Sequence, residues 1–293
     1  MLSLIFASII LLNQLVIPNH FVSLADQGIK NVQYPYSFGL KTTARSVLIT
    51  DSTGEKIIFQ KNSQEILPIA SLTKLMTVLI FLGLNPNLEE IVEIRSEDAI
   101  AEEVQSNSLA PSKINFTVGE KIKLNDLLAV SLIKSANNAV RALVRSTGLG
   151  QEEFVKLMNE KAKLSGMNNT FFVEPTGLSP GNRSTAEDLD KLVKIVFDNP
   201  LIKQLSISKI YNFKTILPDG QEKKYQVRNI NKLLNSFLKI IGAKTGYLDE
   251  AGYCFAGLLE YNNKKMIVVT LNSQSEKDRM QEIKGLTWWA SGR

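Results

Sequence analysis

Residues 68–82 read PIASLTKLMTVLIFL, and their apolar side chains are spread over every face of a predicted helix. A helix with no polar face is enclosed by the rest of its domain, so this segment is predicted to lie at the centre of the fold. Ser71 and Lys74 stand near its beginning, three positions apart, and therefore share one face. The stretch predicts a buried helix that brings a serine and a lysine into the protein interior.

A serine and a lysine in such a setting can act as a nucleophile and its base. The N-terminus of a helix favours developing negative charge, which suits an attacking hydroxyl at Ser71. Burial lowers the pKa of a lysine amine, and a neutral amine can accept a proton from a neighbouring hydroxyl. The alternative is structural: Ser71 caps the helix and the stem of Lys74 extends to solvent, as in most isolated pairs.

The Ser-x-x-Lys spacing alone cannot choose between these interpretations, because it occurs four times in the chain. The three other pairs are Ser131/Lys134, Ser206/Lys209 and Ser236/Lys239. The choice therefore depends on what else the sequence contains.

Length and composition are those of an ordinary folded protein. The chain has 293 residues, of which 44% are hydrophobic and 22% are charged, enough for a full core in one or two domains. The net charge of +5 is spread along the chain, which is compatible with work near anionic polymers or lipid head groups. Nucleic acid is not predicted as a partner.

Histidine and cysteine usage excludes several kinds of site. His20 is the only histidine and lies in a region predicted to be outside the fold, so neither a Ser-His-Asp triad nor a histidine metal site is available. Cys254 is the only cysteine, which rules out an intramolecular disulfide and argues against a catalytic thiol. We predict a packed strand residue there. Neither a metal nor a cofactor is expected.

The N-terminal segment predicts export. Residues 1–18 carry no charge, and Ser23 and Ala25 have the spacing of a signal-peptidase site, so residues 1–25 are predicted to be a signal peptide. No Lys or Arg precedes the apolar run, which leaves two alternatives, a true start upstream of residue 1 and a retained short anchor. A buried N-terminal helix is the structural alternative. Residues 26–40 are predicted to be a connector and residues 41–293 the folded domain.

Hydrophobic periods predict strands at both ends of this domain. Residues 45–62 alternate apolar and polar side chains on both sides of residues 51–54, which is typical of a β-hairpin. The period of two returns near the C-terminus and predicts three strands and a turn at 261–263. These strands cover residues 239–248, 252–260 and 264–272.

Helical patterns fill the chain between these strands. They dominate residues 88–200 and include 184–197, where Ser184 and Thr185 are the predicted cap and Glu187 the capping-box partner. Residues 275–290 predict a closing helix. The fold class is therefore predicted as α/β of the α+β kind, an antiparallel five-stranded sheet flanked by helices and carrying an all-helical subdomain.

Two triplets occur once each and single out one of the four serine–lysine pairs. They are Ser135-Ala136-Asn137 and Lys244-Thr245-Gly246. Only Ser71 precedes both with room for intervening structure, because Ser131 is predicted to share a helix with the first triplet. In order and spacing, the three motifs resemble those of the penicillin-binding proteins and serine β-lactamases.

The sequences around the motifs narrow the resemblance to the low-molecular-mass D-alanyl-D-alanine carboxypeptidases. It is carried by IASLTKLMT, SANNAV, GMNNTFFVEPTGL, STAEDL and GAKTGYLDEAGYC, and it runs from about residue 40 to the C-terminus. The resemblance implies a β-lactamase/transpeptidase-like fold and a serine carboxypeptidase that acts on peptidoglycan stem peptides and is inhibited by β-lactam antibiotics. It also implies work in the periplasm or on the extracellular face of a bacterial membrane.

The resemblance assigns catalytic roles to four residues. Ser71 would attack the carbonyl between two D-alanines and form an acyl-enzyme, while Lys74 takes its proton. Lys244 would keep Lys74 neutral by like-charge repulsion and attract the terminal carboxylate of the substrate. Ser135 would pass a proton to the leaving amine.

Further residues would bind the substrate. Asn137 would hold its backbone amide, and Thr245, within the triplet that includes Gly246, would offer a hydroxyl to its carboxylate. The oxyanion would lie between the backbone N–H groups of Ser71 and Tyr247. Arg279, in the closing helix, is the predicted bidentate partner of the free C-terminus.

The chain departs from this family in three places. Glu174 stands where the family usually has Asn before PTGL, and Asn182-Arg183 replaces a usual His-Tyr pair. Glu174 is therefore either a second base that promotes deacylation, as in a β-lactamase, or a turn residue facing solvent. The chain also ends after the closing helix, so membrane attachment is expected to depend on the N-terminus.

Three alternatives to the carboxypeptidase stay open on the sequence. A D,D-endopeptidase would use the same residues on cross-linked muropeptides, and a serine β-lactamase would lose its penicilloyl adduct quickly. A non-catalytic wall-binding protein is the alternative from another class, and the intact motif residues argue against it.

Overall fold

The computed structural model describes residues 41–99 and 112–293. The predicted signal peptide at 1–25, the connector at 26–40 and His20 lie outside the described residues. Within the described part of the chain, no helix combines the length and apolar character that a membrane crossing requires.

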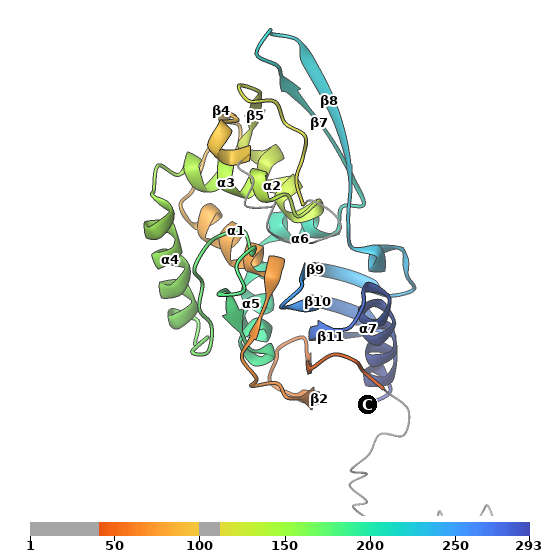
Figure 1. Ribbon diagram of the computed structural model, residues 1–293. Helices are drawn as coiled ribbons and strands as arrows, with labels where there is room; N and C mark the ends of the chain where they lie inside the picture. The colour runs from red at the N-terminus through yellow and green to blue at the C-terminus, as the bar shows by residue number, and fades with distance from the viewer. Residues whose placement is uncertain (1–40, 100–111) are drawn as a thin grey trace, which may run out of the picture. The chain divides into compact units, whose positions relative to one another are not determined.

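A five-stranded antiparallel sheet is built from the two ends of this part of the chain (Figure 1). Its strands lie in the order β2, β1, β11, β10, β9. Their bounds are β1 (Ser46–Asp51), β2 (Ile57–Lys61), β9 (Lys239–Leu248), β10 (Gly252–Tyr261) and β11 (Lys264–Ser273). The predicted hairpin and the three predicted C-terminal strands are confirmed, and β1 joins them by pairing with β11 from Ser46↔Leu271 to Asp51↔Met266.

Helices cover both faces of this sheet. Along β1, Val47 and Ile49 belong to one apolar cluster and Leu48 to another, because alternate side chains of a strand point to opposite faces. The first cluster is completed by α7 (Glu276–Ser291) and the second by α5 (Ala186–Asp198). The predicted closing helix is therefore confirmed.

The helix α5 begins with the predicted cap but without the predicted box. Thr185 accepts a hydrogen bond from the backbone N–H of Asp188 at 3.1 Å. Glu187 instead accepts a hydrogen bond from Ser63 Oγ at 2.8 Å, so its carboxylate ties the helix to the segment after β2. The Glu187 carboxylate therefore bonds to Ser63, which is distant in sequence, instead of forming the predicted capping box.

The helix predicted from residues 68–82 is central and buried, as expected. A short 3-10 helix, η2 (Ala70–Leu72), leads into α1 (Thr73–Gly83), whose side chains Leu75, Met76 and Val78 are fully buried. Other helices surround it (Figure 1). They include α2 (Leu124–Ile133), α3 (Asn137–Ser146), α4 (Gln151–Leu164) and α5, while α6 (Pro200–Ile207) packs against α2 and β9.

The fold class is confirmed, and the structure adds strands to the part predicted to be all-helical. A second sheet has the order β4, β5, β7, β8, and β3 (Leu67–Pro68) pairs separately with β6 (Arg183–Ser184). The added strands are β4 (Ile91–Glu93), β5 (Lys121–Lys123), β7 (Ile210–Ile216) and β8 (Glu222–Arg228). The β7–β8 hairpin projects beyond the helices in Figure 1.

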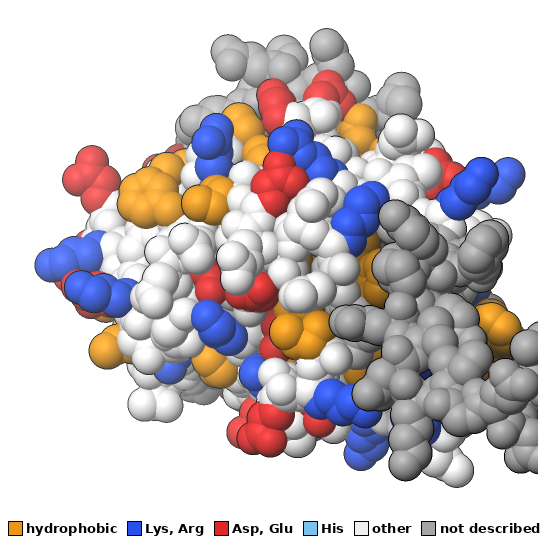
Figure 2. Space-filling view, turned by 90° about the horizontal axis from the view of Figure 1, so that it is seen from below, with side chains coloured by type: hydrophobic (Ala, Val, Ile, Leu, Met, Phe, Trp, Pro, Cys, Tyr) orange, Lys and Arg blue, Asp and Glu red, His pale blue; other side chains and the backbone are white. Residues whose placement is uncertain are grey.

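Charges of both signs are mixed on the surface. The face in Figure 2 carries acidic and basic side chains close together, with hydrophobic side chains scattered between them. Several basic groups are paired across the surface, including Arg45 with Glu65 and Lys239 with Glu260. The excess of positive charge is therefore distributed on this face rather than gathered into one patch.

Candidate active site

Ser71 lies in a tightly packed turn at the start of α1. Ala70, before it, has φ of +48°, a left-handed conformation that is uncommon for a residue with a side chain. Gly177, at φ +85°, packs against this turn, and a methyl group on it would lie 2.3 Å from the Ala70 carbonyl oxygen. Only glycine fits there, and the contact fixes the backbone on which the Ser71 hydroxyl is mounted.

The Lys74 amine is fully buried beside that hydroxyl. Its Nζ lies 3.0 Å from Ser71 Oγ and 2.7 Å from Asn137 Oδ1, and it also donates to the carbonyl oxygen of Thr176. A neutral amine has two N–H groups and one lone pair. In this neutral form the Ser71 hydroxyl can donate to the lone pair while the N–H groups serve the other two oxygens. That is the arrangement that proton transfer from Ser71 requires.

The other three serine–lysine spacings have a different local structure. Each of these serines donates its hydroxyl to the carbonyl oxygen three residues before it, the usual local bond of serine in a helical turn. The bonds are Ser131 to Leu128 at 2.7 Å, Ser206 to Lys203 at 2.9 Å and Ser236 to Leu233 at 2.7 Å. Among these four pairs, all within the described part of the chain, only Ser71 is hydrogen-bonded to its own lysine.

Ser135 occupies a turn rather than the helix that it was predicted to share with Ser131. It lies between α2 and α3 with φ of +61° and is buried. Left-handed non-glycine residues of this kind are costly and cluster at functional sites. The turn directs Ser135 Oγ to Lys244 Nζ, 2.9 Å away, and starts α3 at Asn137, whose N–H is held by the Ser112 carbonyl at 2.6 Å.

Lys244 is a buried cation on the edge strand β9. Its Nζ donates to Ser135 Oγ and to the Thr245 carbonyl oxygen at 2.8 Å. Burial, and then the charges of Lys74 and Arg279, hold the pKa of Lys244 well below its usual value. A ligand carboxylate beside Lys244 would favour the protonated form of its amine.

The rest of the triplet runs directly alongside the nucleophile. A methyl group on Gly246 would lie 3.0 Å from the Ser71 backbone nitrogen, so strand and turn are in close contact. Thr245, before it, is buried. Tyr247, after it, stacks on Tyr253 with ring centroids 4.3 Å apart and donates its hydroxyl to Asp249 at 2.6 Å. The backbone N–H groups of Ser71 and Tyr247 thus belong to neighbouring segments.

Arg279 lies against the end of the same strand. Its Nη1 donates to the carbonyl oxygens of Gly246 at 3.2 Å and Cys254 at 3.3 Å, and its guanidinium lies 5.5 Å from the centre of the Tyr253 ring. Burial lowers its pKa. Nη1 of the guanidinium is therefore bonded to the sheet, while the buried Nε has no hydrogen-bond partner among the described residues. Cys254 is buried in β10, as predicted.

Glu174 is half-buried and turns its carboxylate toward its own loop. The carboxylate accepts hydrogen bonds from the N–H and Oγ1 of Thr176 and from the N–H of Gly177, all at 2.6 Å, and from Asn182 Nδ2 at 2.7 Å. The roles of second base and of turn residue both stay predictions. Sequence reasoning also missed the Thr176 carbonyl, since backbone groups leave no motif.

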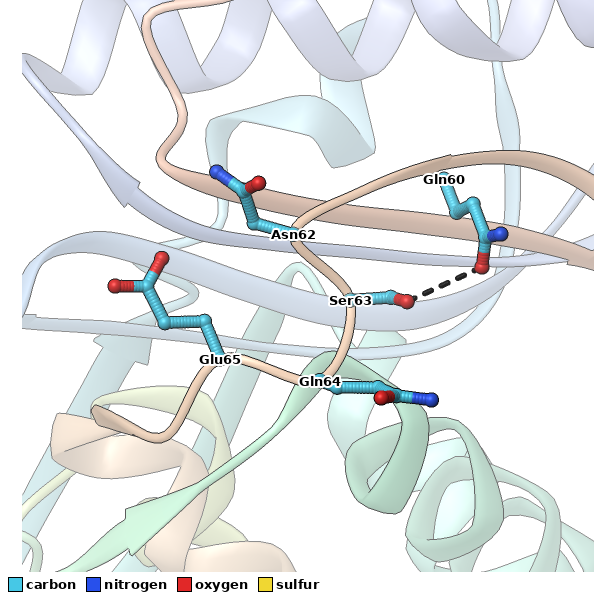
Figure 3. A pocket seen from close by; sticks show the side chains of 5 residues that line it. All are labelled: Gln60, Asn62, Ser63, Gln64 and Glu65. Carbon is cyan, nitrogen blue, oxygen red and sulfur yellow. Dashed lines mark hydrogen bonds between the residues drawn. The ribbon is translucent and has the colours of Figure 1, made fainter.

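A polar hollow of about 650 Å³ lies elsewhere, at the end of β2. Figure 3 shows that one stretch of chain, residues 60–65, supplies the side chains that line it. Ser63 donates to Gln60 at 3.2 Å, and Glu65 is paired with Arg45. None of the predicted site residues lines this hollow, so it is not the candidate active site.

A buried lysine beside a half-buried serine, with a second lysine on the edge strand of such a sheet, is typical of serine-type peptidases with a transpeptidase-like fold. The family model described as D-alanyl-D-alanine carboxypeptidase, peptidase family S11, matches residues 30–275. The chain belongs to this family.

Individual relatives carry two kinds of name. The D-alanyl-D-alanine carboxypeptidase DacF of Bacillus subtilis is 33% identical over 240 residues, covering 81% of this chain and 59% of the relative. The D-alanyl-D-alanine endopeptidase of Pseudomonas aeruginosa is 34% identical over 245 residues, 83% of this chain and 76% of the relative. The crystal structure of the Streptomyces K15 DD-transpeptidase matches with a TM-score of 0.80 and 25% identity, covering 86% of this chain and 98% of that one.

Proposed function

We propose that this protein is a serine D-alanyl-D-alanine carboxypeptidase that acts on peptidoglycan stem peptides and is acylated by β-lactams. The observation that carries the proposal is the buried Lys74 amine, 3.0 Å from Ser71 Oγ, with acceptor oxygens placed for its N–H groups. The family supports the substrate class. The relative from Bacillus subtilis is matched over only 59% of its length, so its activity is transferred as part of this proposal.

The proposed acylation begins at Ser71. Its Oγ attacks the carbonyl carbon of the penultimate D-alanine while Lys74 accepts its proton. The backbone N–H groups of Ser71 and Tyr247 stabilise the oxyanion, and each such donor typically contributes about 3 kcal/mol. As the C–N bond breaks, Ser135 delivers a proton to the departing D-alanine amine, and Lys244 lies 2.9 Å from Ser135 Oγ to replace it. Water then hydrolyses the ester and restores the Ser71 hydroxyl.

The remaining predicted residues bind the substrate in this proposal. Asn137 holds the substrate amide beside the amine of Lys74, which its Oδ1 already contacts at 2.7 Å. The terminal carboxylate meets Lys244 and the hydroxyl of Thr245, and Gly246 allows the strand to approach the nucleophile. Arg279, whose Nη1 contacts the carbonyl oxygens of Gly246 and Cys254, is the proposed second partner of the same carboxylate.

The proposed substrate implies a location outside the cytoplasm. Residues 1–25 are proposed to direct export, either as a cleaved signal peptide or as a membrane anchor, and residues 41–293 to form the catalytic domain. The protein would then work in the periplasm or on the extracellular face of the membrane.

An endopeptidase is the second candidate, because relatives with that name match well. The Pseudomonas relative is covered over 76% of its length. Release of D-alanine from a stem peptide, compared with cleavage of a cross-linked muropeptide, separates the two activities.

Intact-mass spectrometry tests the proposal. Incubation with penicillin is expected to add the mass of one penicillin to the protein, and the adduct is expected to be lost slowly. Incubation with a peptide ending in D-Ala-D-Ala is expected to yield the peptide shortened by one alanine. Rapid loss of the penicilloyl group would identify a β-lactamase, and no adduct with either compound would overturn the proposal.

Arg279→Ala is expected to discriminate between free and blocked C-termini. Loss of the guanidinium removes a charge-assisted contact worth about 1.5–3 kcal/mol, so kcat/KM on the free acid should fall roughly ten- to a hundredfold. The same peptide with an amidated C-terminus shows any additional effect of losing the bonds to the Gly246 and Cys254 carbonyls. Equal losses on both peptides would leave Arg279 with a purely structural role.

The depressed pKa of Lys244 predicts a pH dependence. A carboxylate is attracted only to the protonated amine, so binding of the free acid weakens as pH rises through the lowered pKa of Lys244. The ratio of kcat/KM for the free acid to that for the amide should therefore fall well below the pH at which an ordinary lysine titrates. Lys244→Arg keeps the charge, and in that variant the ratio should stay level. A level ratio in the wild-type protein would contradict the assignment.

A further inference from the structure

We propose that Glu174 is a positioning residue for the Ser71–Lys74 pair and that it acts together with Asn182. This inference rests on the proposed function. It concerns the two places where the loop before STAEDL departs from the family pattern, and the structure shows that these departures touch each other. Asn182 Nδ2 donates to the Glu174 carboxylate at 2.7 Å and to the Glu174 carbonyl oxygen at 3.0 Å.

The first arm of this arrangement aims a carbonyl at Lys74. Glu174 accepts the N–H of Gly177 at 2.6 Å, and that N–H belongs to the same peptide group as the Thr176 carbonyl. The N–H and C=O of a trans peptide point in opposite directions. By holding the N–H, the carboxylate turns the Thr176 oxygen away from itself and towards Lys74 Nζ, which donates to it.

The second arm reaches the residue before the nucleophile. The fully buried Asn182 shares the two hydrogens of its amide between the Glu174 oxygens and Thr73 Oγ1, 3.1 Å away, and Thr73 Oγ1 donates to the Ala70 carbonyl oxygen at 2.7 Å. Ala70 is the residue with φ of +48°. This chain of bonds therefore supports the costly backbone conformation from which Ser71 projects.

A carboxylate suits this position better than an amide. Glu174 receives four hydrogen bonds of 2.6–2.7 Å, and all four partners are donors. An amide of the same length has one acceptor oxygen and an NH2 group, which would face some of these donors with hydrogens. The Thr176–Gly177 peptide would then lose the bond that fixes its plane.

Further contact keeps the loop in register with α1. Thr77 Oγ1 donates to the Pro175 carbonyl at 2.6 Å, one turn after Lys74 donates to the Thr176 carbonyl. Two consecutive carbonyl groups of the loop thus accept hydrogen bonds from side chains on successive turns of α1. The loop is bound to α1 at both of these points, so a change at Glu174 acts on the Lys74 contact rather than releasing the whole loop.

The test is the pre-steady-state kinetics of penicillin acylation in Glu174→Gln. We expect the first-order acylation rate to fall about a hundredfold, the size of effect that a small misplacement of a catalytic group produces. The dissociation constant of the complex that precedes acylation should stay within about twofold, since the Glu174 carboxylate is turned to its own loop and to Asn182. Glu187→Gln removes another half-buried glutamate, the one bonded to Ser63, and should leave both constants unchanged.

A rescue experiment separates positioning from general stability. Glu174→Asn and Asn182→His should each slow acylation, whereas the double variant restores the pair usual in the resembling family and should recover at least tenfold over either single variant. This comparison also decides the matter if Glu174→Gln does not fold.

Three outcomes would overturn the inference. Wild-type acylation rates in Glu174→Gln, or losses in the double variant that simply add, would remove the positioning role. Slower loss of the penicilloyl group with unchanged acylation would make Glu174 a deacylation base instead. Failure of the wild-type protein to react with penicillin is a separate result, which overturns the proposed function and the inference with it.

Discussion

Penicillin is expected to acylate Ser71 and no other serine, and Ser71→Ala is expected to abolish the reaction. Removing a catalytic nucleophile typically costs about a millionfold in rate, which places the variant below detection in an acylation assay. The physical reason is local. Ser71 Oγ is 3.0 Å from a buried amine, whereas Ser131, Ser206 and Ser236 donate their hydroxyls to backbone carbonyls of their own turns.

Peptide mapping of the labelled protein identifies the modified serine. Ser206→Ala is a matched control, because it removes a largely buried serine with the same Ser-x-x-Lys spacing and should acylate at the wild-type rate. An adduct on Ser131, Ser206 or Ser236, or normal labelling of Ser71→Ala, would show that the nucleophile has been assigned wrongly.

Periodicity was sufficient for the sheet and for the central helix. The strands β9 to β11 follow one another with short turns, so local pattern and final pairing agree. Because α1 has apolar side chains on every face, it is stable only when it is buried in the protein. That β1 and β11 belong to one sheet could be predicted although the two strands are far apart in sequence. Strands from both ends of the domain carry apolar side chains that are buried when they join one sheet.

Features that depend on a single backbone angle or on a distant partner were harder to predict. Ser135 interrupts a pattern that reads as one helix, and its φ of +61° follows from the packing of α2 against α3 rather than from its own preference. The β7–β8 hairpin did carry a signal, alternating residues around a Pro-Asp-Gly turn at 218–220, but it lies beyond residues 88–200 and we predicted no strands there.

The candidate site shows the same division. Motif order was enough to name Ser71, Lys74, Ser135 and Lys244 as neighbours, and the structure places Lys74 beside Ser71 and Lys244 beside Ser135. The direction in which a side chain points could not be predicted from the motifs. Glu174 was marked as unusual, but only the fold shows that its carboxylate turns inward to its own loop.

Lys74→Met is expected to fold and to acylate about 100- to 10,000-fold more slowly than the wild-type protein. That range is the typical contribution of a general base. Methionine is the informative replacement because its unbranched, flexible side chain fills most of the space of the buried lysine stem, whereas alanine would leave a cavity in a packed core. The variant retains Ser71 and the cation at Lys244, so any loss reports on the amine.

Stopped-flow acylation by a chromogenic cephalosporin measures this loss, with thermal unfolding as the check on folding. Lys209→Met is the matched control: it removes the exposed lysine of the Ser206/Lys209 spacing and should have no effect on the rate. A near-normal rate in Lys74→Met would mean that another group takes the Ser71 proton. Lys244 would be the next candidate, because its lowered pKa makes its neutral form accessible and Ser135 Oγ, 2.9 Å away, could carry the proton to it. The double variant Lys74→Met/Lys244→Met would then lose the activity that the single variant kept.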